Sequence, residues 1–318
     1  MKPKILVITP IDSIRGVRAS LERAGQVTYW PDPVYRRVLK AIHRFDAVFT
    51  NPNKSKVPFS RELLKRAVRL KVICTASTGT NHIDKTFARR RGIRVLSLTE
   101  ERRLINRIHS TAELALGLLL AGLRRIPAAQ ASVKKGVWDY EPFIGRQLDR
   151  LTVGIVGYGR LGRRFAHYAL ALGARVLVYD PNKKVRRTGL RQVPLRTLLG
   201  ASDALSLHVH VTPETEKMVD ERWFSNMKKN VVIVNTSRGE IVDERALLKF
   251  LKKNRSAVYA TDVLSNEMRG IRKNPVFRAA LKDPRILITP HIGGMTEEAR
   301  EMAYTHAARM LRRHLRST

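Results

Sequence analysis

The chain has 318 residues, 43% of them hydrophobic, which is long enough for two domains with substantial cores. The apolar runs fall short of the roughly 18–20 residues that a membrane span requires. A single cysteine, Cys74, excludes an internal disulfide framework and a cysteine-rich metal site, so we expect a cytoplasmic protein without a metal ion.

The charge is unusual, because 61 Lys and Arg residues stand against 27 Asp and Glu residues. Successive quarters of the chain hold 16, 15, 14 and 16 basic residues. A dedicated nucleic-acid module would cluster them. We therefore expect salt-dependent, nonspecific attraction of polyanions and no specific nucleic-acid partner.

In chain order, the first hundred residues alternate between strand and helix patterns. Strands are predicted at residues 4–8, 47–50, 71–75 and 93–96, and helices at 14–24 and 60–68. This alternation favours a small parallel sheet. The third strand is followed by small residues around Gly79, which suit either a nest of backbone N–H groups for a carboxylate or an ordinary polar turn.

A longer helix is predicted over residues 112–125. Ser110 to Glu113 matches a capping box at its start, and Pro127 is expected to stop it. Because this helix is apolar nearly all round, we expect it to lie between domains or at a subunit interface. Residues 136–150 show no clear periodicity and are expected to form a connection.

Residues 151–180 carry the pattern of a dinucleotide-binding unit. An apolar strand leads into Gly157-Tyr158-Gly159-Arg160-Leu161-Gly162, a G-x-G-x-x-G. A helical pattern then ends at Gly173, and a second strand ends on Asp180. The glycines permit a tight turn, close approach of a pyrophosphate and close helix packing, while the acid can bind a ribose diol. The ordered combination predicts dinucleotide binding more strongly than a lone glycine motif would.

Four further strands are predicted at residues 204–209, 231–235, 257–262 and 286–289. Polar residues follow them at the edge where open α/β sheets bind ligands, notably Arg238, Glu267 and His291. A guanidinium can hold a substrate carboxylate, an imidazole can exchange a proton near neutral pH, and a carboxylate can orient that imidazole. The three residues suit hydride transfer involving a 2-hydroxy or 2-oxo acid, although each alone could be an ordinary surface residue.

The whole chain resembles the D-isomer-specific 2-hydroxyacid dehydrogenase family. The motifs that carry the resemblance are residues 157–162 with Asp180, 206–208 through 212–215, 235–239 with 243–244, 262–263 with Glu267, and 289–294. The resemblance implies an α/β protein with two domains. One is a doubly wound, Rossmann-type NAD-binding domain (100–291), and the other is a smaller, flavodoxin-like parallel α/β substrate domain (1–99 and 292–318).

The resemblance also implies roles for individual residues. Arg238 would bind substrate, His291 would act as general acid and base, and Glu267 would pair with His291. The substrate carboxylate would meet Thr78 and Gly79. Cofactor contacts would come from Gly157, Tyr158, Gly159, Arg160, Leu161, Gly162, Asp180, His208, Thr236, Asp262 and Gly293. The implied partners are NAD, a small anionic 2-hydroxy or 2-oxo acid and a second copy of the chain, with no membrane.

Departures from the family pattern leave alternatives open. Met268 replaces a frequent proline, and the segment from Glu267 to His291 is longer than usual, which should loosen the aim of Glu267. Lys54 and Lys56 could meet a substrate phosphate. Cations at 183, 184 and 186 keep NADP as an alternative to NAD. The alternative function is that of an NAD(H)-sensing binding protein, similar to the corepressors of this family.

Overall fold

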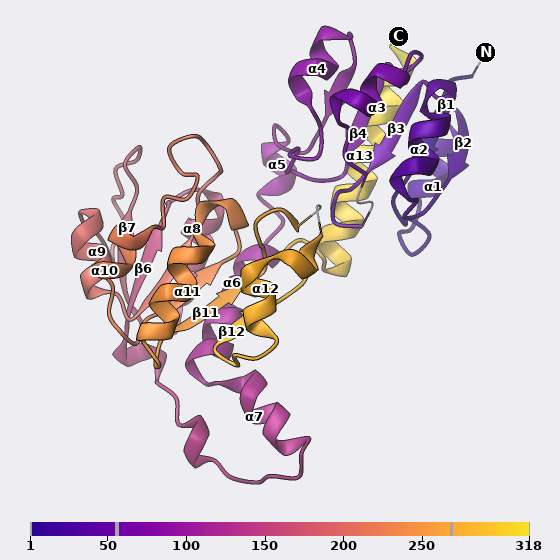
Figure 1. Cartoon of the computed structure of the whole chain (residues 1–318). Coiled ribbons are helices and arrows are strands. Elements are labelled where there is room, and N and C mark those ends of the chain that lie inside the picture. Colours follow the sequence, from indigo (N-terminus) through magenta and orange to yellow (C-terminus); the bar gives the residue numbers. More distant parts are fainter. Residues whose placement is uncertain (1, 55–56, 268–269, 318) are drawn as a thin grey trace. The chain divides into compact units, whose positions relative to one another are not determined.

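The structure, a computed structural model, describes residues 2–54, 57–267 and 270–317. The chain divides into two compact units, Met1–Ile108 with Gly294–Thr318, and His109–Gly293 (Figure 1). The boundary expected between residues 99 and 100 falls inside the first unit, because α5 (Arg102–Ile105) packs against the C-terminal helix α13 (Glu297–Arg316). The second boundary lies after residue 293, where we expected it after residue 291.

The first unit is built on a five-stranded, all-parallel sheet with strand order β2-β1-β3-β4-β5. This is the flavodoxin-like order, and the predicted α/β class is correct. Its remaining elements are β1 (Lys4–Val7), α1 (Val17–Glu22), β2 (Gln26–Tyr29), α2 (Tyr35–Ala41), the 3-10 helix η1 (Ile42–Arg44), β3 (Ala47–Thr50), α3 (Arg61–Arg66), β4 (Val72–Thr75), α4 (Lys85–Arg90) and β5 (Arg94–Leu96).

The C-terminal helix completes the core of this unit. Ala303, Tyr304 and Leu311 of α13 pack with α1 and one face of the sheet. The Cys74 thiol on β4 donates a hydrogen bond to the carbonyl of Ala307 (3.3 Å). Burial raises the pKa of this thiol, so it serves as a small apolar group of the core.

The second unit is built on a seven-stranded sheet with strand order β12-β11-β10-β9-β6-β7-β8, in which every pairing is parallel. The order reverses between β6 and β9, as in the Rossmann fold. The strands are β6 (Thr152–Val156), β7 (Arg175–Tyr179), β8 (Leu190–Gln192), β9 (Ala204–Leu207), β10 (Val232–Asn235), β11 (Val258–Thr261) and β12 (Ile286–Ile288).

Helices connect and cover these strands (Figure 1). They are α6 (Ser110–Leu123), α7 (Ile126–Val133), α8 (Arg160–Ala171), α9 (Leu195–Ala201), α10 (Glu221–Ser225), α11 (Glu244–Lys253) and α12 (Pro275–Ala280). Short 3-10 helices are η2 (Glu141–Phe143), η3 (Leu148–Arg150), η4 (Gly239–Ile241) and η6 (Ile271–Lys273).

The region of α6 and α7 corrects two expectations. Ser110 lies inside α6 and its hydroxyl caps nothing, so the predicted capping box is wrong. Pro127 does not end a helix, because the chain breaks at Arg125, whose φ is 51°, and Pro127 then lies in the first turn of α7. One face of α6 packs on α8, β10 and β11, so much of its apolar surface is covered within its own unit.

The structure also tests for membrane spans and metal clusters. In the described residues, every helix is too short or too polar to cross a bilayer. The same residues contain no group of three or more His, Cys, Asp or Glu side chains arranged to hold a metal ion.

Candidate active site

The turn between β6 and α8 has the geometry that a glycine-rich dinucleotide loop requires. Gly157 has a φ of 89°, and a Cβ there would lie 2.5 Å from the carbonyl oxygen of His208. A Cβ on Gly162 would overlap the carbonyl of Gly157. Beside Gly159 there is open space within 4 Å, so a ligand can approach its backbone. The tight turn at Gly157 and the close packing at Gly162 therefore match the structure, and the open space at Gly159 leaves the room that the predicted approach of a pyrophosphate requires.

Asp180 lies at the end of β7, next to this loop. One carboxylate oxygen accepts a hydrogen bond from the Tyr158 N–H (2.8 Å), and the other accepts one from Asn182 N–H (2.9 Å). A carboxylate has about four acceptor sites, so both oxygens can still accept a bond from a hydroxyl. Asp180 thus holds the glycine loop and retains the capacity to bind a ribose diol.

Two further cofactor candidates lie at the ends of β9 and β10. The Nε2 atom of His208 is 2.8 Å from the Ser206 hydroxyl, and burial lowers the pKa of His208 to about 3, so the ring is neutral. Thr236 is 5% exposed, and its hydroxyl has no hydrogen-bond partner in the described residues. A buried hydroxyl without a partner at the same sheet edge as the open glycine loop fits a polar ligand such as a dinucleotide.

Glu267 and His291 form a short side-chain contact at this edge of the sheet. Nδ1 of His291 lies 2.6 Å from a carboxylate oxygen of Glu267, and the two side chains are 30% and 29% exposed. The other Glu267 oxygen accepts the N–H of Leu264 (2.9 Å), which fixes the carboxylate. The pairing is close, so the loosened aim that we expected from the longer segment is not found. Met268 lies outside the described residues.

Asp262 holds the loop that carries His291. One of its oxygens accepts bonds from the Thr289 hydroxyl (2.5 Å) and Ile292 N–H (2.8 Å), and the other accepts Gly293 N–H (2.7 Å). His291 has a φ of 56°, an uncommon conformation for a residue other than glycine. Burial raises the pKa of Asp262, and the three hydrogen bonds act in the opposite direction. This carboxylate therefore positions the histidine loop.

Arg238 follows β10, the neighbour of β11 in the sheet. Its guanidinium donates to the carbonyl of Ser237 (2.7 Å) and has no ion pair with a carboxylate in the described part of the chain. A Cβ on Gly239 would overlap the backbone of Leu264 and Ser265, so the arginine turn lies directly against the segment that leads to Glu267. The structure thus brings these two predicted segments together.

Sequence reasoning did not assign roles to Glu244, Thr289 or Thr111. Glu244 accepts bonds from the Ser265 N–H (2.9 Å) and the Asn274 side chain, which lie on either side of Glu267. The Thr111 hydroxyl donates to the carbonyl of Gly293 (3.0 Å). The sequence motifs contain these residues, but only their hydrogen bonds in the folded protein show that they support the segments of Glu267 and His291.

The predicted carboxylate nest belongs to the other unit. The carbonyl of Thr78 accepts a bond from Thr99, and that of Gly79 accepts one from Ser77 (both 2.8 Å). These bonds fix the loop after β4 through its carbonyl groups.

The two lysines predicted to meet a substrate phosphate lie on another loop of the same unit. The Nζ atom of Lys54 lies 3.5 Å from a carboxylate oxygen of Asp32, and Lys56 lies outside the described residues.

Comparisons with known proteins agree with this geometry. Residues 116–293 match the family model described as "D-isomer specific 2-hydroxyacid dehydrogenase, NAD binding domain". The solved structure of an NAD and lactic acid complex of D-lactate dehydrogenase from Aquifex aeolicus is similar, with a TM-score of 0.83 and 27% identity. That similarity covers 99% of this chain and 96% of the other.

Two relatives show the extent of the similarity in sequence. Glyoxylate reductase from Thermococcus litoralis is 35% identical over 95% of this chain and 90% of its own length. D-3-phosphoglycerate dehydrogenase from Methanocaldococcus jannaschii is 34% identical over 98% of this chain but 57% of its own length. The chain therefore spans little more than half of the phosphoglycerate dehydrogenases that it matches. On these grounds, the chain belongs to the D-isomer-specific 2-hydroxyacid dehydrogenase family.

Proposed function

We propose that the protein is an NAD-dependent D-2-hydroxyacid dehydrogenase that interconverts a small 2-oxo acid and its D-2-hydroxy acid. The observation that carries the proposal is the 2.6 Å contact between His291 and Glu267, at the same sheet edge as the glycine loop. An imidazole held by a carboxylate suits proton transfer near neutral pH. Bound NAD would supply or accept the hydride at substrate C2.

In this proposal each residue has a chemical task. Because Nδ1 of His291 is engaged by Glu267, the ring exchanges its proton with the substrate oxygen through Nε2. Glu267 stabilises the imidazolium that exists when the ring holds both protons. Arg238 binds the substrate carboxylate and polarises the carbonyl. In the other unit, the backbone N–H groups of Thr78 and Gly79 are the proposed substrate contacts.

The cofactor residues would divide between the two ends of the dinucleotide. Residues 157–162 and the N-terminus of α8 would bind the pyrophosphate, and Asp180 the adenosine ribose. Thr236, Asp262 and Gly293 would lie at the nicotinamide end, with His208 beneath the glycine loop. The Asp180 carboxylate would repel a 2′-phosphate, which favours NAD over NADP.

The proposal is tested by following the oxidation of NADH at 340 nm with glyoxylate, pyruvate, hydroxypyruvate or phosphohydroxypyruvate as the substrate. Each assay is repeated with NADPH in place of NADH. We expect turnover with at least one acid, and its loss in the variants Arg238→Ala and His291→Ala. NADH binding without turnover on any acid would contradict the dehydrogenase and favour the NAD(H)-sensing alternative. No binding of NADH would contradict both functions.

We also propose that the two units divide the work, with His109–Gly293 binding the cofactor and the other unit binding substrate. Each unit expressed alone would test this division. The cofactor unit should retain NADH fluorescence enhancement, and the other unit should show none.

A homodimer is the final part of the proposal. Large exposed apolar side chains concentrate between residues 126 and 144, and they include Ile126, Trp138 (91% exposed), Tyr140 and Ile144. Figure 1 shows α7 and the following segment extending away from the rest of their unit. A patch of this kind marks an interaction site, and a second copy would cover it.

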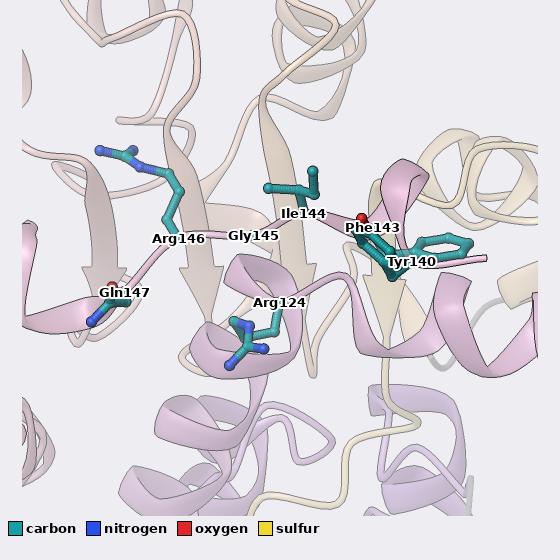
Figure 2. A pocket seen from close by; sticks show the side chains of 7 residues that line it. All are labelled: Arg124, Tyr140, Phe143, Ile144, Gly145, Arg146 and Gln147. Carbon is teal, nitrogen blue, oxygen red and sulfur yellow. The ribbon is translucent and has the colours of Figure 1, made fainter. Parts of the chain in front are cut away.

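A pocket of about 390 Å³ lies where this segment returns, and it is lined by Arg124, Tyr140 and residues 143–147. Figure 2 shows Tyr140 and Phe143 at one end and Arg146 at the other.

Because a second copy would cover the exposed apolar segment, sedimentation should give a dimer, and Trp138→Glu should shift the protein towards the monomer. A monomeric parent protein would contradict this interface. Cell fractionation would test the expected cytoplasmic location.

A further inference from the structure

The basic residues are spread evenly along the sequence, but the fold does not spread them evenly in space. In a parallel α/β unit every helix-to-strand connection returns to the edge where strands begin, which we call the amino edge. Every strand-to-helix connection leaves from the opposite, carboxyl edge, where ligands bind. A chain that alternates strands and helices can therefore place most of its excess basic residues along one edge of the sheet.

The second unit shows the asymmetry clearly. Its carboxyl edge has seven basic and nine acidic residues among the described residues of 157–163, 208–221, 236–247, 262–274 and 289–293. Its amino edge has ten basic and three acidic residues, in 146–151, 172–175, 200–203, 226–231, 252–257 and 281–285. The connection between β7 and β8 adds Asp180, Lys183 and Lys184 to the carboxyl edge, because residues 180–185 are hydrogen-bonded to Gln192 at the carboxyl end of β8; its remaining residues run back towards the start of β8 and belong to neither count.

The first unit has the same asymmetry. Its carboxyl edge holds nine basic and six acidic residues among the described residues of 8–20, 30–38, 51–64, 76–88 and 97–105. Its amino edge holds twelve basic and two acidic residues, in 2–4, 21–26, 42–47, 65–72 and 89–94. All twelve basic residues are exposed.

Most acids of the amino edges are already neutralised by local partners. Asp203 is 6% exposed and accepts bonds from Arg146 and Lys228 (both 3.0 Å). Asp46 is 9% exposed and pairs with Arg69 (3.0 Å). Asp283 pairs with Arg285 in the same way. The amino-edge cations of the first unit nevertheless all remain exposed to solvent.

Helix dipoles explain only part of this surplus. A cation in the last turn of a helix is favourable, and amino-edge connections follow helix C-termini. That effect accounts for the presence of cations such as Arg89 and Arg90 in the last turn of α4. It does not require Arg91 and Arg94 beyond that helix, or Arg69 and Lys71 beyond α3.

We propose that the amino edges bind the phosphate backbone of nucleic acid without reading its base sequence. Strands lie about 4.8 Å apart, so edges of five and seven strands span roughly 19 and 29 Å, enough for several phosphates. The exposed aromatic residues Trp138 and Tyr140 lie outside these edges, so the edges offer cations without a stacking platform. In the second unit the surface lies opposite the glycine loop, so nucleic acid and NADH bind independently.

Matched variants of the full chain test the proposal. The edge variant carries Arg89→Gln, Arg90→Gln and Arg91→Gln. The control carries Arg36→Gln, Arg102→Gln and Arg103→Gln, which removes the same charge from exposed carboxyl-edge positions. Binding of labelled 20-nucleotide single-stranded DNA, duplex DNA and RNA is followed by anisotropy between 50 and 300 mM KCl.

The association constant K falls as salt rises, and the edge variant should make this dependence less steep. For duplex DNA, the negative slope of log K against log salt should shrink in magnitude by up to about 2.7, at roughly 0.9 for each lost phosphate contact. Affinity at 100 mM salt should fall by at least about tenfold, with less change in the control. Equal losses in both variants would show that net charge alone acts and would overturn the proposal. Dependence on base sequence, or equal competition by polyglutamate, would overturn it too.

NADH binding and thermal melting check that the variants fold. If the edge variant is unfolded, Lys252→Gln, Lys253→Gln and Arg255→Gln provide the same test at the amino edge of the second unit. Because NADH binding is measured separately, loss of nucleic-acid binding cannot be mistaken for failure of the proposed dehydrogenase.

Discussion

The substitution Asp262→Asn tests whether a buried carboxylate holds the histidine loop. Both oxygens of Asp262 are used, one by Thr289 and Ile292 and the other by Gly293. An asparagine can keep one oxygen, but its amide group would then face the Gly293 N–H, donor against donor. One buried backbone donor loses its acceptor, which costs about 1–3 kcal/mol.

Asp243→Asn provides a matched control. A single oxygen of Asp243 accepts both the Arg245 and Ala246 N–H groups at the start of α11, so an asparagine keeps both bonds. Its cost should stay below about 0.5 kcal/mol, because Asn and Asp are similar N-caps. Urea unfolding of the two variants measures the difference directly, without any assumption about activity.

Turnover then tests the consequence for catalysis. Displacing a reacting group by about 1 Å can cost about 100-fold, so we expect Asp262→Asn to lower kcat at least tenfold. Equal free energies of unfolding for the two variants would refute the clamp. A destabilised Asp262→Asn protein with normal kcat would show that the clamp supports the fold but not the position of His291.

Three further predictions follow from other contacts. Gly162→Ala should destabilise the protein and abolish NADH binding, because its Cβ would overlap Gly157. Gly117→Ala is the control, since Gly117 on α6 has open space around it, and this change should stabilise the protein by about 0.5–1 kcal/mol. Thermal melting would measure the stability of each variant, and NADH fluorescence would measure its cofactor binding. Burial lowers the pKa of His82 to about 4, below its ordinary 6.5, so its unfolded form binds protons first and stability falls as pH drops through this range. His82 should contribute about 2 kcal/mol to the loss between pH 7 and pH 5, so in urea titrations His82→Gln should lose about 2 kcal/mol less than the parent protein, while the loss due to His208 remains in both. Glu267→Gln should lower kcat about 10- to 100-fold by removing a charge-assisted hydrogen bond, and unchanged turnover would exclude its role.

The sequence predicted the regular parts of both sheets because buried parallel strands appear as continuous apolar runs. It missed β2 and β8, which lie at sheet edges and carry half-exposed residues. It also missed α7, because Pro127 is equally compatible with the end of one helix and the first turn of another. Only the left-handed backbone at Arg125 distinguishes the two.

The candidate site shows a similar limit. Arg238, Glu267 and His291 could be singled out because each follows a predicted strand, and the fold places strand ends at one edge. The supporting contacts of Glu244 and Thr111 come from helix starts, far along the chain from the groups that they hold. No local pattern identifies such partners, since their role depends on which loops the fold brings together.

The charge distribution has the same origin, because the fold that gathers strand ends at one edge also gathers strand starts at the opposite edge. Equal quarters of basic residues argued against a nucleic-acid module only on the assumption that nearness in sequence means nearness in space. The alternation of strands and helices breaks that assumption, because it sorts each repeat into two ends. The carboxyl edges combine comparable numbers of acids and bases with the proposed chemistry, and the amino edges hold about half of the chain's net positive charge. One periodic architecture can therefore carry a small-molecule site and a polyanion surface on opposite edges of the same sheet.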